Sequence, residues 1–175
     1  MNTMPPIELD TPRLLLRLMQ PSDLDDLLKI FGDPKVMDSF NEEPFTKEQM
    51  QRWLQRNLAH QDEFGYGLFS VILKSENLLI GDCGLEHMDV EGEQKTELGY
   101  DFCSDYWNQG YATEAASAVR DFAFHRLKLP GLISLIRKGN QSSRRVAEKV
   151  GMALEEEITR YAIDYWIFSM ANPLS

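Results

Sequence analysis

A short turn near the middle of the chain could bind an anion through its backbone. The run Gln109-Gly110-Tyr111-Ala112-Thr113 follows a strand-like segment and opens an amphipathic helix. The first N–H groups of a helix lack intrahelical partners, and the helix dipole favours negative charge at that end. Gly110 and Ala112 leave room for a bulky anion, so the local chemistry suits a pyrophosphate. A plain connection that binds nothing is the alternative, because many helices begin after a glycine.

A second pattern follows about thirty residues later in the chain. Asn140 to Met152 reads NQSSRRVAEKVGM, which has the form N-x-x-S-x-R-V-x-E-K-x-G followed by a hydrophobic residue. With the turn at 109–113, in this order and at this separation, it resembles the GNAT acyl-CoA N-acyltransferases, and within them the ribosomal-protein N-acetyltransferase branch (RimJ and RimL). The resemblance extends to the opening Thr11–Arg17, the segment Gly81–Leu85 and the run Glu97–Tyr100. It therefore covers nearly the whole chain.

The resemblance implies that acetyl-CoA is a co-substrate, held mostly by backbone groups. The N–H groups of residues 109–113 would hold the CoA pyrophosphate. Backbone near Leu98, Tyr100 and Phe102 would pair with pantetheine, as an added strand does, and this needs no particular side chain. Asn140 would bridge pantetheine and the following helix, and its alternative role is that of a turn or helix-start asparagine.

The proton for the departing thiolate has a less regular source. Ser143 could protonate the thiolate or cap the helix that it begins, and the two roles need not exclude each other. Many family members carry a tyrosine four residues further on, but this chain has Ala147 there. Trp107 also stands where the family often has Gln or Arg, although tryptophan is familiar in the RimJ and RimL branch. The resemblance therefore implies neither the usual tyrosine acid nor side-chain help at Trp107.

Glu97 is the leading candidate for the general base. It lies in the strand that would face the thioester, and a glutamate in the corresponding strand is a base in parts of the family. Glu86 and His87, on the neighbouring strand, are alternatives that could act through water. Simple solvation on a half-exposed strand is the competing interpretation for all three, because charged side chains are rarely buried without partners.

The resemblance implies an N-acetyltransferase that acts by direct attack of a primary amine in a ternary complex. It favours a protein or peptide N-terminal α-amine, such as that of a ribosomal protein. A polyamine, an aminoglycoside or an amino acid is the alternative acceptor. A catalytically inactive CoA-binding regulatory module is the rival from another class, and the missing tyrosine supports it. A nucleotide-phosphate enzyme is disfavoured, because the sequence contains neither G-x-x-x-x-G-K-[ST] nor a G-x-G-x-x-G after a strand.

The composition indicates one domain that binds neither nucleic acid nor membrane. A chain of 175 residues with 43% hydrophobic content fits a single domain, 1–175, with a substantial core. The net charge of −10 disfavours the phosphate neutralisation that dominates nucleic-acid binding. No apolar stretch reaches membrane-spanning length, and the opening MNTMPPIELD lacks the features of a signal peptide. We therefore expect a cytoplasmic protein.

The cysteines and histidines indicate neither a disulfide nor a metal site. Cys83 and Cys103 form no C-x-x-C pair, and each lies in a strand-like stretch where a reduced cysteine behaves as a small hydrophobe. His60, His87 and His125 share no metal-ligand spacing with the cysteines. We expect reduced cysteines and no metal.

The elements that position these residues are expected in the order of the GNAT fold, in the α/β (α+β) class. Periodicity predicts strands at 13–18, 67–73, 78–88, 95–102, 132–137, 152–157 and 161–170. It predicts helices at 22–31, from 46 to at least 58, from 111 to about 127, and at 142–150. Caps are expected from Ser22 with Asp25, from Thr46 with Gln49, and from Ser142 or Ser143. We expect a mostly antiparallel, twisted sheet of about seven strands, about four helices, and a central parallel pair, 95–102 and 132–137, splayed at the CoA site, because a strand–helix–strand unit of this length is a parallel crossover.

Overall fold

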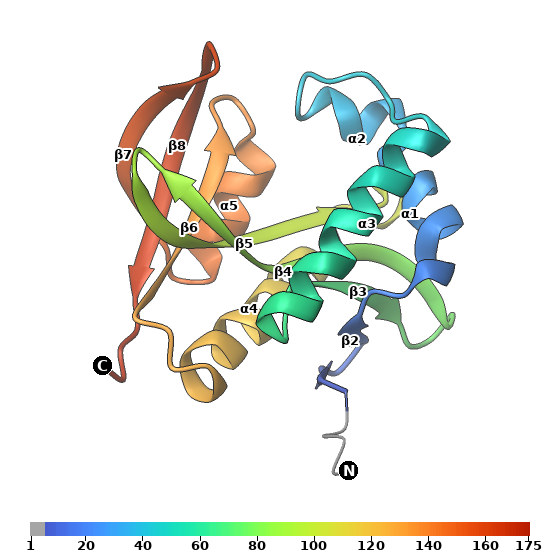
Figure 1. Cartoon of the computed structure of the whole chain (residues 1–175), viewed down its shortest axis with the longest axis horizontal. Coiled ribbons are helices and arrows are strands. Elements are labelled where there is room, and N and C mark those ends of the chain that lie inside the picture. Colours follow the sequence, from blue (N-terminus) through green and yellow to red (C-terminus); the bar gives the residue numbers. More distant parts are fainter. Residues whose placement is uncertain (1–5) are drawn as a thin grey trace.

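The computed structural model describes residues 6–175, which form a mixed eight-stranded sheet with helices on both faces (Figure 1). The first five residues, part of the N-terminal stretch considered above, lie outside this description. The strand order is β1-β2-β3-β4-β5-β6-β8-β7, and every neighbouring pair is antiparallel except β5 and β6. The expected fold class and the central parallel pair are confirmed.

The element bounds follow the sequence expectation closely. The strands are β1 (Glu8–Asp10), β2 (Leu14–Leu18), β3 (Leu68–Leu73), β4 (Leu78–Val90), β5 (Glu93–Phe102), β6 (Gly131–Arg137), β7 (Ala153–Arg160) and β8 (Ile163–Ala171). The helices are α1 (Leu24–Phe31), α2 (Pro34–Asp38), α3 (Lys47–Phe64), α4 (Tyr111–Asp121) and α5 (Gln141–Lys149). Short 3-10 turns lie at η1 (Pro21–Asp23) and η2 (Ser104–Tyr106), and α4 continues as a π-helical segment, η3 (Phe122–Arg126).

Two short elements, β1 and α2, were not expected. β1 pairs antiparallel with β2 over three residues. α2 begins after Asp33, whose side chain accepts a hydrogen bond from the Lys35 N–H, with Pro34 in the first helical position. Both elements are too short for a hydrophobic period to develop, so spacing alone could not reveal them.

Helix starts agree with the expectation at α3 but not at α1. Thr46 and Gln49 form the expected capping box, with reciprocal bonds of 2.8 and 3.2 Å. The Ser22–Asp25 capping box was wrong. Instead, the Asp23 side chain accepts a hydrogen bond from the Gln20 N–H at 2.9 Å. Residues 21–23 form the short helical turn η1, and α1 begins after it.

The last two strands meet in a two-residue turn that periodicity placed inside a strand. Tyr161 and Ala162 have φ values of 51° and 62°, so both adopt the left-handed conformation of a type I′ hairpin turn. Asparagine and glycine usually fill this turn, and their absence hid it in the sequence. The turn at Glu91 and Gly92 has the same form, with φ values of 53° and 85°, and lets β4 and β5 extend further than expected.

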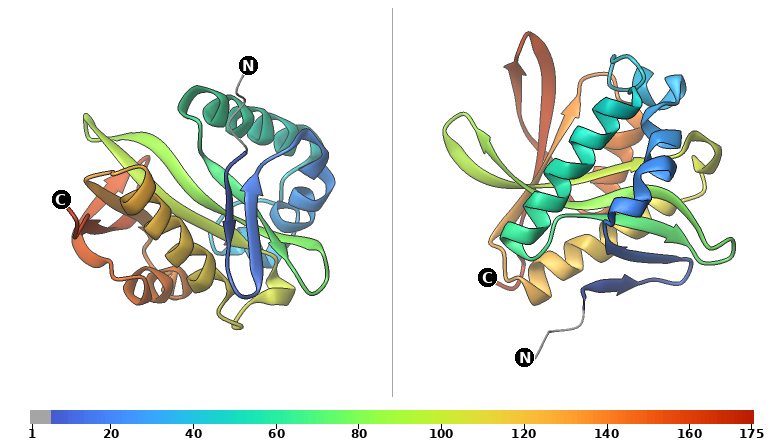
Figure 2. Two further views of the ribbon diagram at one scale, coloured as in Figure 1. Left: turned by 90° about the horizontal axis from the view of Figure 1, so that it is seen from below. Right: turned by 45° about the vertical axis from the view of Figure 1, so that its right-hand side comes forward.

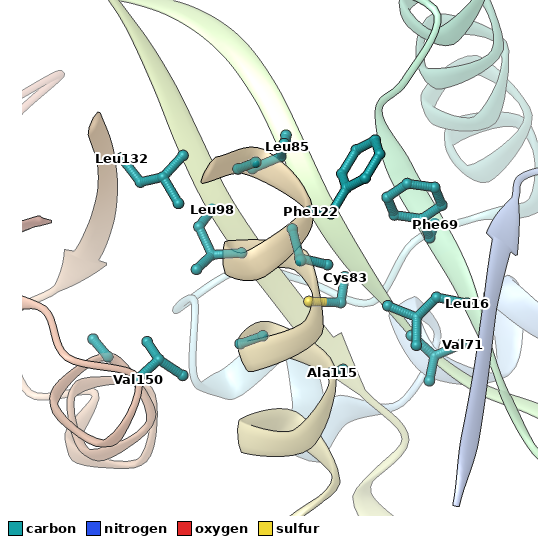
Figure 3. Packing of buried hydrophobic residues seen from close by; sticks show 14 of the residues in the cluster. Leu16, Phe69, Val71, Cys83, Leu85, Leu98, Ala115, Phe122, Leu132 and Val150 are labelled. Atoms are coloured by element: carbon teal, nitrogen blue, oxygen red, sulfur yellow. The ribbon is translucent and has the colours of Figure 1, made fainter. Parts of the chain in front are cut away.

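The two faces of the sheet pack against different helices, as the two views of Figure 2 show. On one face, Leu85 and Leu98 join residues of α4 and α5 in the largest hydrophobic cluster (Figure 3). On the other face, Leu68 and Leu79 pack against α1 and α3. Because successive side chains of a strand point to opposite faces, Glu97 lies on the α1/α3 face. Cys83 is buried and Cys103 is half-buried, and both are free cysteines.

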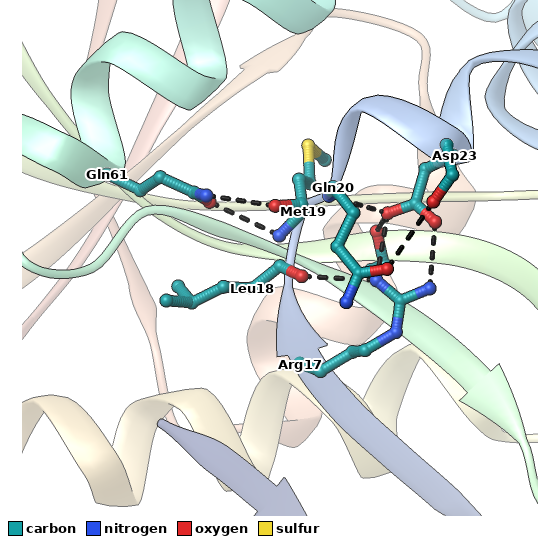
Figure 4. A network of polar contacts seen from close by, with 8 residues as sticks. Arg17, Leu18, Met19, Gln20, Asp23 and Gln61 are labelled. Carbon is teal, nitrogen blue, oxygen red and sulfur yellow. Dashed lines mark hydrogen bonds and ion pairs between the residues drawn. The ribbon is translucent and has the colours of Figure 1, made fainter. Parts of the chain in front are cut away.

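A polar network at the end of β2 holds α3 and η1 against the sheet (Figure 4). Arg17 donates to both carboxylate oxygens of Asp23, at 2.7 and 2.9 Å. The Gln61 side chain bonds the Met19 backbone N–H and carbonyl at 3.2 and 2.9 Å. These bidentate contacts fix the helices that cover the α1/α3 face.

Candidate active site

The parallel strands β5 and β6 separate just beyond one register pair, Glu97 with Ile133. The Ser134 hydroxyl donates to the Leu98 carbonyl at 2.6 Å, and the Leu135 N–H donates to Glu97 Oε2 at 2.7 Å. In a regular parallel pair, backbone groups of the neighbouring strand would bond the Leu98 carbonyl and the Leu135 N–H. Here side chains bond them instead. The expected splay of the central pair begins here.

Alternate peptide groups of β5 face the splay. The Cys103 N–H donates to the Ile80 carbonyl of β4 at 2.8 Å, so odd-numbered residues direct their backbone bonds to β4 and even-numbered residues toward β6. The carbonyl of Phe102 accepts a hydrogen bond from Trp107 Nε1 at 2.9 Å, and the Leu98 carbonyl is taken by Ser134. Three residues were expected to pair with pantetheine through their backbone. Among them, Tyr100 is the one whose carbonyl accepts no hydrogen bond from a side chain of the described residues.

The turn at 109–113 forms the N-terminus of α4 as expected. Gly110 is the N-cap with φ 82°, a conformation that favours glycine, and the first helical bond runs from the Glu114 N–H to its carbonyl. Within residues 6–175, no backbone or side-chain acceptor bonds the N–H groups of Gln109, Gly110, Tyr111, Ala112 or Thr113. Five donors at a helix N-terminus are therefore available to an anion.

Arg13 supports this turn, and the sequence did not single it out as a site residue. Its Nη1 donates to the Gln109 carbonyl at 2.9 Å, and its Nε pairs with Glu114 at 2.8 Å. The guanidinium carbon lies 4.2 Å from the centre of the Tyr111 ring, and Thr11 also donates to Glu114. The only available signal was the Thr-Pro-Arg opening of the resemblance. Arg13 thus places a guanidinium group, paired with Glu114, beside the free amides.

Asn140 and Ser143 lie together at the start of α5. Asn140 Oδ1 accepts a hydrogen bond from the Ser143 N–H at 3.2 Å, so Asn140 is the helix cap. The expected cap at Ser142 or Ser143 was wrong, because the chain enters the helix one residue before them. The Tyr100 hydroxyl crosses from β5 and donates to the Ser143 carbonyl at 2.6 Å. This bond fixes the first turn of α5 beside the splay, and the Ser143 hydroxyl remains a candidate acid.

Glu97 and Glu86 face each other across β5 and β4, whereas His87 lies on the other face. Burial raises the pKa of Glu97 to about 8, against the hydrogen bond from Leu135, which lowers it. Burial also raises the pKa of Glu86. His87 is engaged elsewhere, with its ring bonded to the Tyr66 hydroxyl. The structure therefore brings Glu97 and Glu86 together at the splay and separates His87 from them.

Neither a metal site nor a membrane span is visible in the described part of the chain. Among residues 6–175, no three His, Cys, Asp or Glu side chains gather so that they could hold a metal ion. None of the helices there has the length and apolarity to cross a bilayer.

Known proteins show the same domain. Residues 13–153 match the family described as Acetyltransferase (GNAT) domain. The protein YkkB of Bacillus subtilis (strain 168) is 33% identical over 155 residues, which cover 88% of this chain and 90% of YkkB. The N-acetyltransferase YnaD of the same organism is 32% identical over 149 residues, which cover 85% and 84% of the two chains.

Solved structures agree with this assignment. The acetyltransferase (GNAT family) of Bacillus anthracis superimposes with a TM-score of 0.80 at 29% identity, over 95% of this chain and 99% of the other. The ribosomal-protein-S5-alanine acetyltransferase of Vibrio fischeri has a TM-score of 0.78 at 20% identity, over 95% and 97%, a likeness that concerns the fold. The two motifs, the splayed strands and the family match over most of the sequence agree, and the chain belongs to the GNAT acetyltransferase family.

Proposed function

We propose that the protein transfers an acetyl group from acetyl-CoA directly to a primary amine in a ternary complex. The observation that carries this is the set of five free amides at 109–113, together with the separation of β5 and β6 at Glu97 and Ser134. The diphosphate binds at the turn, and pantetheine runs along the Tyr100 and Phe102 peptide groups. The thioester then lies near the point where β5 and β6 separate.

Two side chains of this site move the protons. Glu97, as a carboxylate, takes a proton from the acceptor ammonium, and the free amine attacks the thioester carbonyl. The C–S bond breaks as the amide C–N bond forms, and the thiolate leaves with the electron pair. The Ser143 hydroxyl gives its proton to the thiolate. The nitrogen loses its second proton to solvent as the amide forms, and solvent restores the proton of the Ser143 hydroxyl. A base with a pKa of about 8 is well matched to this task near neutral pH.

The acceptor that we favour is a protein or peptide N-terminal α-amine. Its support is the sequence resemblance to the RimJ and RimL branch, together with the fold shared with the ribosomal-protein acetyltransferase. A ribosomal protein is then a natural partner, and a single cytoplasmic domain spanning 1–175 fits that role. A small amine is the alternative acceptor.

Binding of acetyl-CoA to Gly110→Val, measured by calorimetry, tests the cofactor site. A β-branched residue is strained at φ 82° and crowds the Arg13 guanidinium, 3.3 Å from a Cβ built there. We expect the affinity to fall at least tenfold, whereas the matched change Gly92→Val, at a distant turn with positive φ, leaves it unchanged. Unchanged affinity in a folded Gly110→Val variant would remove the turn from the site.

A catalytically inactive CoA-binding module is the second candidate. Ala147 in place of the usual tyrosine favours it, as does the engagement of Glu97 Oε2 by Leu135. Labelled acetyl-CoA offered with a panel of amines and N-terminal peptides separates the two proposals. Tight binding without product on any acceptor would favour the inactive module, whereas thiol release that depends on the acceptor supports the enzyme.

A further inference from the structure

Four carboxyl groups lie on one face of β4 and β5, which we call the carboxyl face. The register pairs Asp82 with Asp101 and Glu86 with Glu97, and the pair of glycines Gly84 and Gly99 lies between them. Side chains directly opposite in an antiparallel pair share a face. The leucines at 85 and 98 point the other way, into the core beside α4. The carboxyl face is thus the α1/α3 side of the sheet, next to the splay.

No cation of the described chain pairs with these four groups. Within residues 6–175, every ion pair involves other carboxylates. Asp82 is fully buried, and within residues 6–175 its oxygens find no hydrogen-bond partner apart from the facing carboxyl group of Asp101. Ser70, its neighbour on β3, donates instead to Asp23 at 2.7 Å. Burying carboxyl groups without partners is costly, so the arrangement calls for a positive charge from outside the chain.

Gly99, between Glu97 and Asp101, leaves the carboxyl face uncrowded at this point of β5. A Cβ built on Gly99 would meet only Glu97 Oε1 and Leu68 Cδ2, both at 4.0 Å. The facing glycine on β4 is different, because a Cβ on Gly84 would lie 2.2 Å from the Gly67 carbonyl oxygen. The opening is therefore on β5, the strand along which the thioester would lie.

We propose that the acceptor carries two positive charges, with its reacting amine at Glu97 and its second cationic group at Asp101, backed by Asp82. This inference rests on the proposed acetyltransferase function and specifies its substrate class. Glu97 and Asp101 are four residues apart on one strand, about 13 Å at roughly 3.3 Å per residue, and both point to the same face. An extended aliphatic chain between two nitrogens spans such a distance.

The state without a ligand is consistent with this role. Burial raises the pKa of Asp101 to about 7 and that of Asp82 well above its ordinary range. Two facing carboxyl groups whose pKa values are raised in this way share a proton near neutral pH. The charge of Arg56 of α3 lowers the pKa of Glu86, and that of Arg160 of β7 lowers the pKa of Glu97, but neither arginine forms an ion pair with the carboxyl face. A bound cation replaces the shared proton.

The experiment compares kcat/KM for 1,8-diaminooctane, octylamine and 8-aminooctanoate, which differ only in the charge at the far end. The wild-type protein should prefer the diamine over octylamine by about tenfold or more, as expected for a charged hydrogen bond, and should disfavour the amino acid. Asp101→Asn should bring the diamine to octylamine ratio close to one. Its fold should survive, because the amide can donate to Asp82. The matched control Asp62→Asn, an exposed carboxylate of α3, should leave the ratio unchanged.

Gly99→Val is the second variant, because its side chain fills the opening. It should lower kcat/KM for both amines at least tenfold while acetyl-CoA affinity by calorimetry is retained. Equal use of the diamine and octylamine by the wild-type protein, or a ratio unaffected by Asp101→Asn, would overturn the dication inference and leave the proposed function standing. Absence of product on every amine despite acetyl-CoA binding would overturn both.

Two sources could supply this chemistry, a polyamine or a basic peptide N-terminus. Spermidine against butylamine tests the first source, and a tetrapeptide pair with lysine or norleucine at the second position tests the second. A preference for the charged member of either pair supports the inference and identifies the source. Indifference in both pairs contradicts it.

Discussion

Replacing Glu97 by Gln should make the protein less active and, at alkaline pH, more stable. Glutamine keeps an amide oxygen to accept the Leu135 N–H, so the hydrogen bond at the splay is retained. It removes the charge that burial disfavours. Activity and stability therefore change in opposite directions, which a merely local loss of packing would not produce.

The stability effect follows from the pKa of Glu97, which is raised from 4.5 to about 8. Between these values the folded state holds a proton that the unfolded chain has released, so the free energy of unfolding falls as pH rises. One pKa unit corresponds to about 1.4 kcal/mol, which gives about 5 kcal/mol across the whole window. This is an upper limit, because the side chain is only partly buried. Glu97→Gln should gain little at pH 5 and up to this amount at pH 9.

The activity effect has the opposite sign. Only about one tenth of Glu97 is ionised at pH 7 when its pKa is about 8, so wild-type kcat/KM should rise through pH 8. Removal of a positioned base costs roughly 10² to 10⁴ in rate, and the variant should lose the rising limb as well.

Thiol release between pH 6 and 9.5 and denaturant unfolding between pH 5 and 9 measure both effects. Glu155→Gln, an exposed carboxylate on β7, is the matched control and should leave both profiles unchanged. A Glu97→Gln variant that keeps the rising limb would exclude Glu97 as the base. A stability difference that does not widen with pH would refute the argument from burial.

Three further predictions concern the turn at 109–113, the cap of α5 and the half-buried His60. Arg13→Gln should weaken CoA binding by about tenfold in calorimetry, because it removes a charge-assisted hydrogen bond to the turn. It should leave the KM for S-acetylpantetheine unchanged, because that substrate lacks the diphosphate. Equal losses with both ligands would indicate a general disruption of the structure. Asn140→Ala should lower the free energy of unfolding by about 1 kcal/mol because it caps α5, whereas Ser143→Ala should cost less than about 0.5 kcal/mol and slow turnover; a larger stability loss for Ser143→Ala than for Asn140→Ala would contradict the observed cap. His60 bonds the Tyr66 carbonyl and the His87 N–H, and burial lowers its pKa. The free energy of unfolding should therefore be largest above pH 6.5 and decline as pH falls toward the pKa of the folded state. In urea unfolding, this dependence on pH should vanish in His60→Gln, and an unchanged dependence would show that another group titrates.

The sequence predicted the elements that have a long period and missed those that do not. The strands around Leu85 and Leu98 and the helix after Gly110 were expected at nearly their observed bounds, because burial repeats along them. β1 and α2 are too short to show a period, and the turn at Tyr161 lacks the residues that usually mark it.

The candidate site was predictable where backbone conformation forms it and unpredictable where side chains meet across strands. The free amides at 109–113 follow from a local motif. The contacts of Arg13 with the turn and of Glu97 with Leu135 join residues remote in sequence. The same holds for Asp82 opposite Asp101, since a shift of one residue in register would place the two on different faces. Register between strands is a tertiary property, so no single segment of sequence contains it.

Two hydrogen bonds made by side chains replace the backbone ladder where β5 and β6 separate. A regular parallel ladder would satisfy Leu98 and Leu135 with backbone bonds and close the gap between β5 and β6. Here Ser134 and Glu97 satisfy those groups with side chains, so the strands separate without leaving the Leu98 carbonyl or the Leu135 N–H unpaired. The bond that holds the gap open also places a desolvated carboxyl at its apex, where an amine would meet the thioester. The same contact thus spans the gap between β5 and β6 and holds the Glu97 carboxyl beside it, while burial raises the pKa of that carboxyl against the effect of the bond.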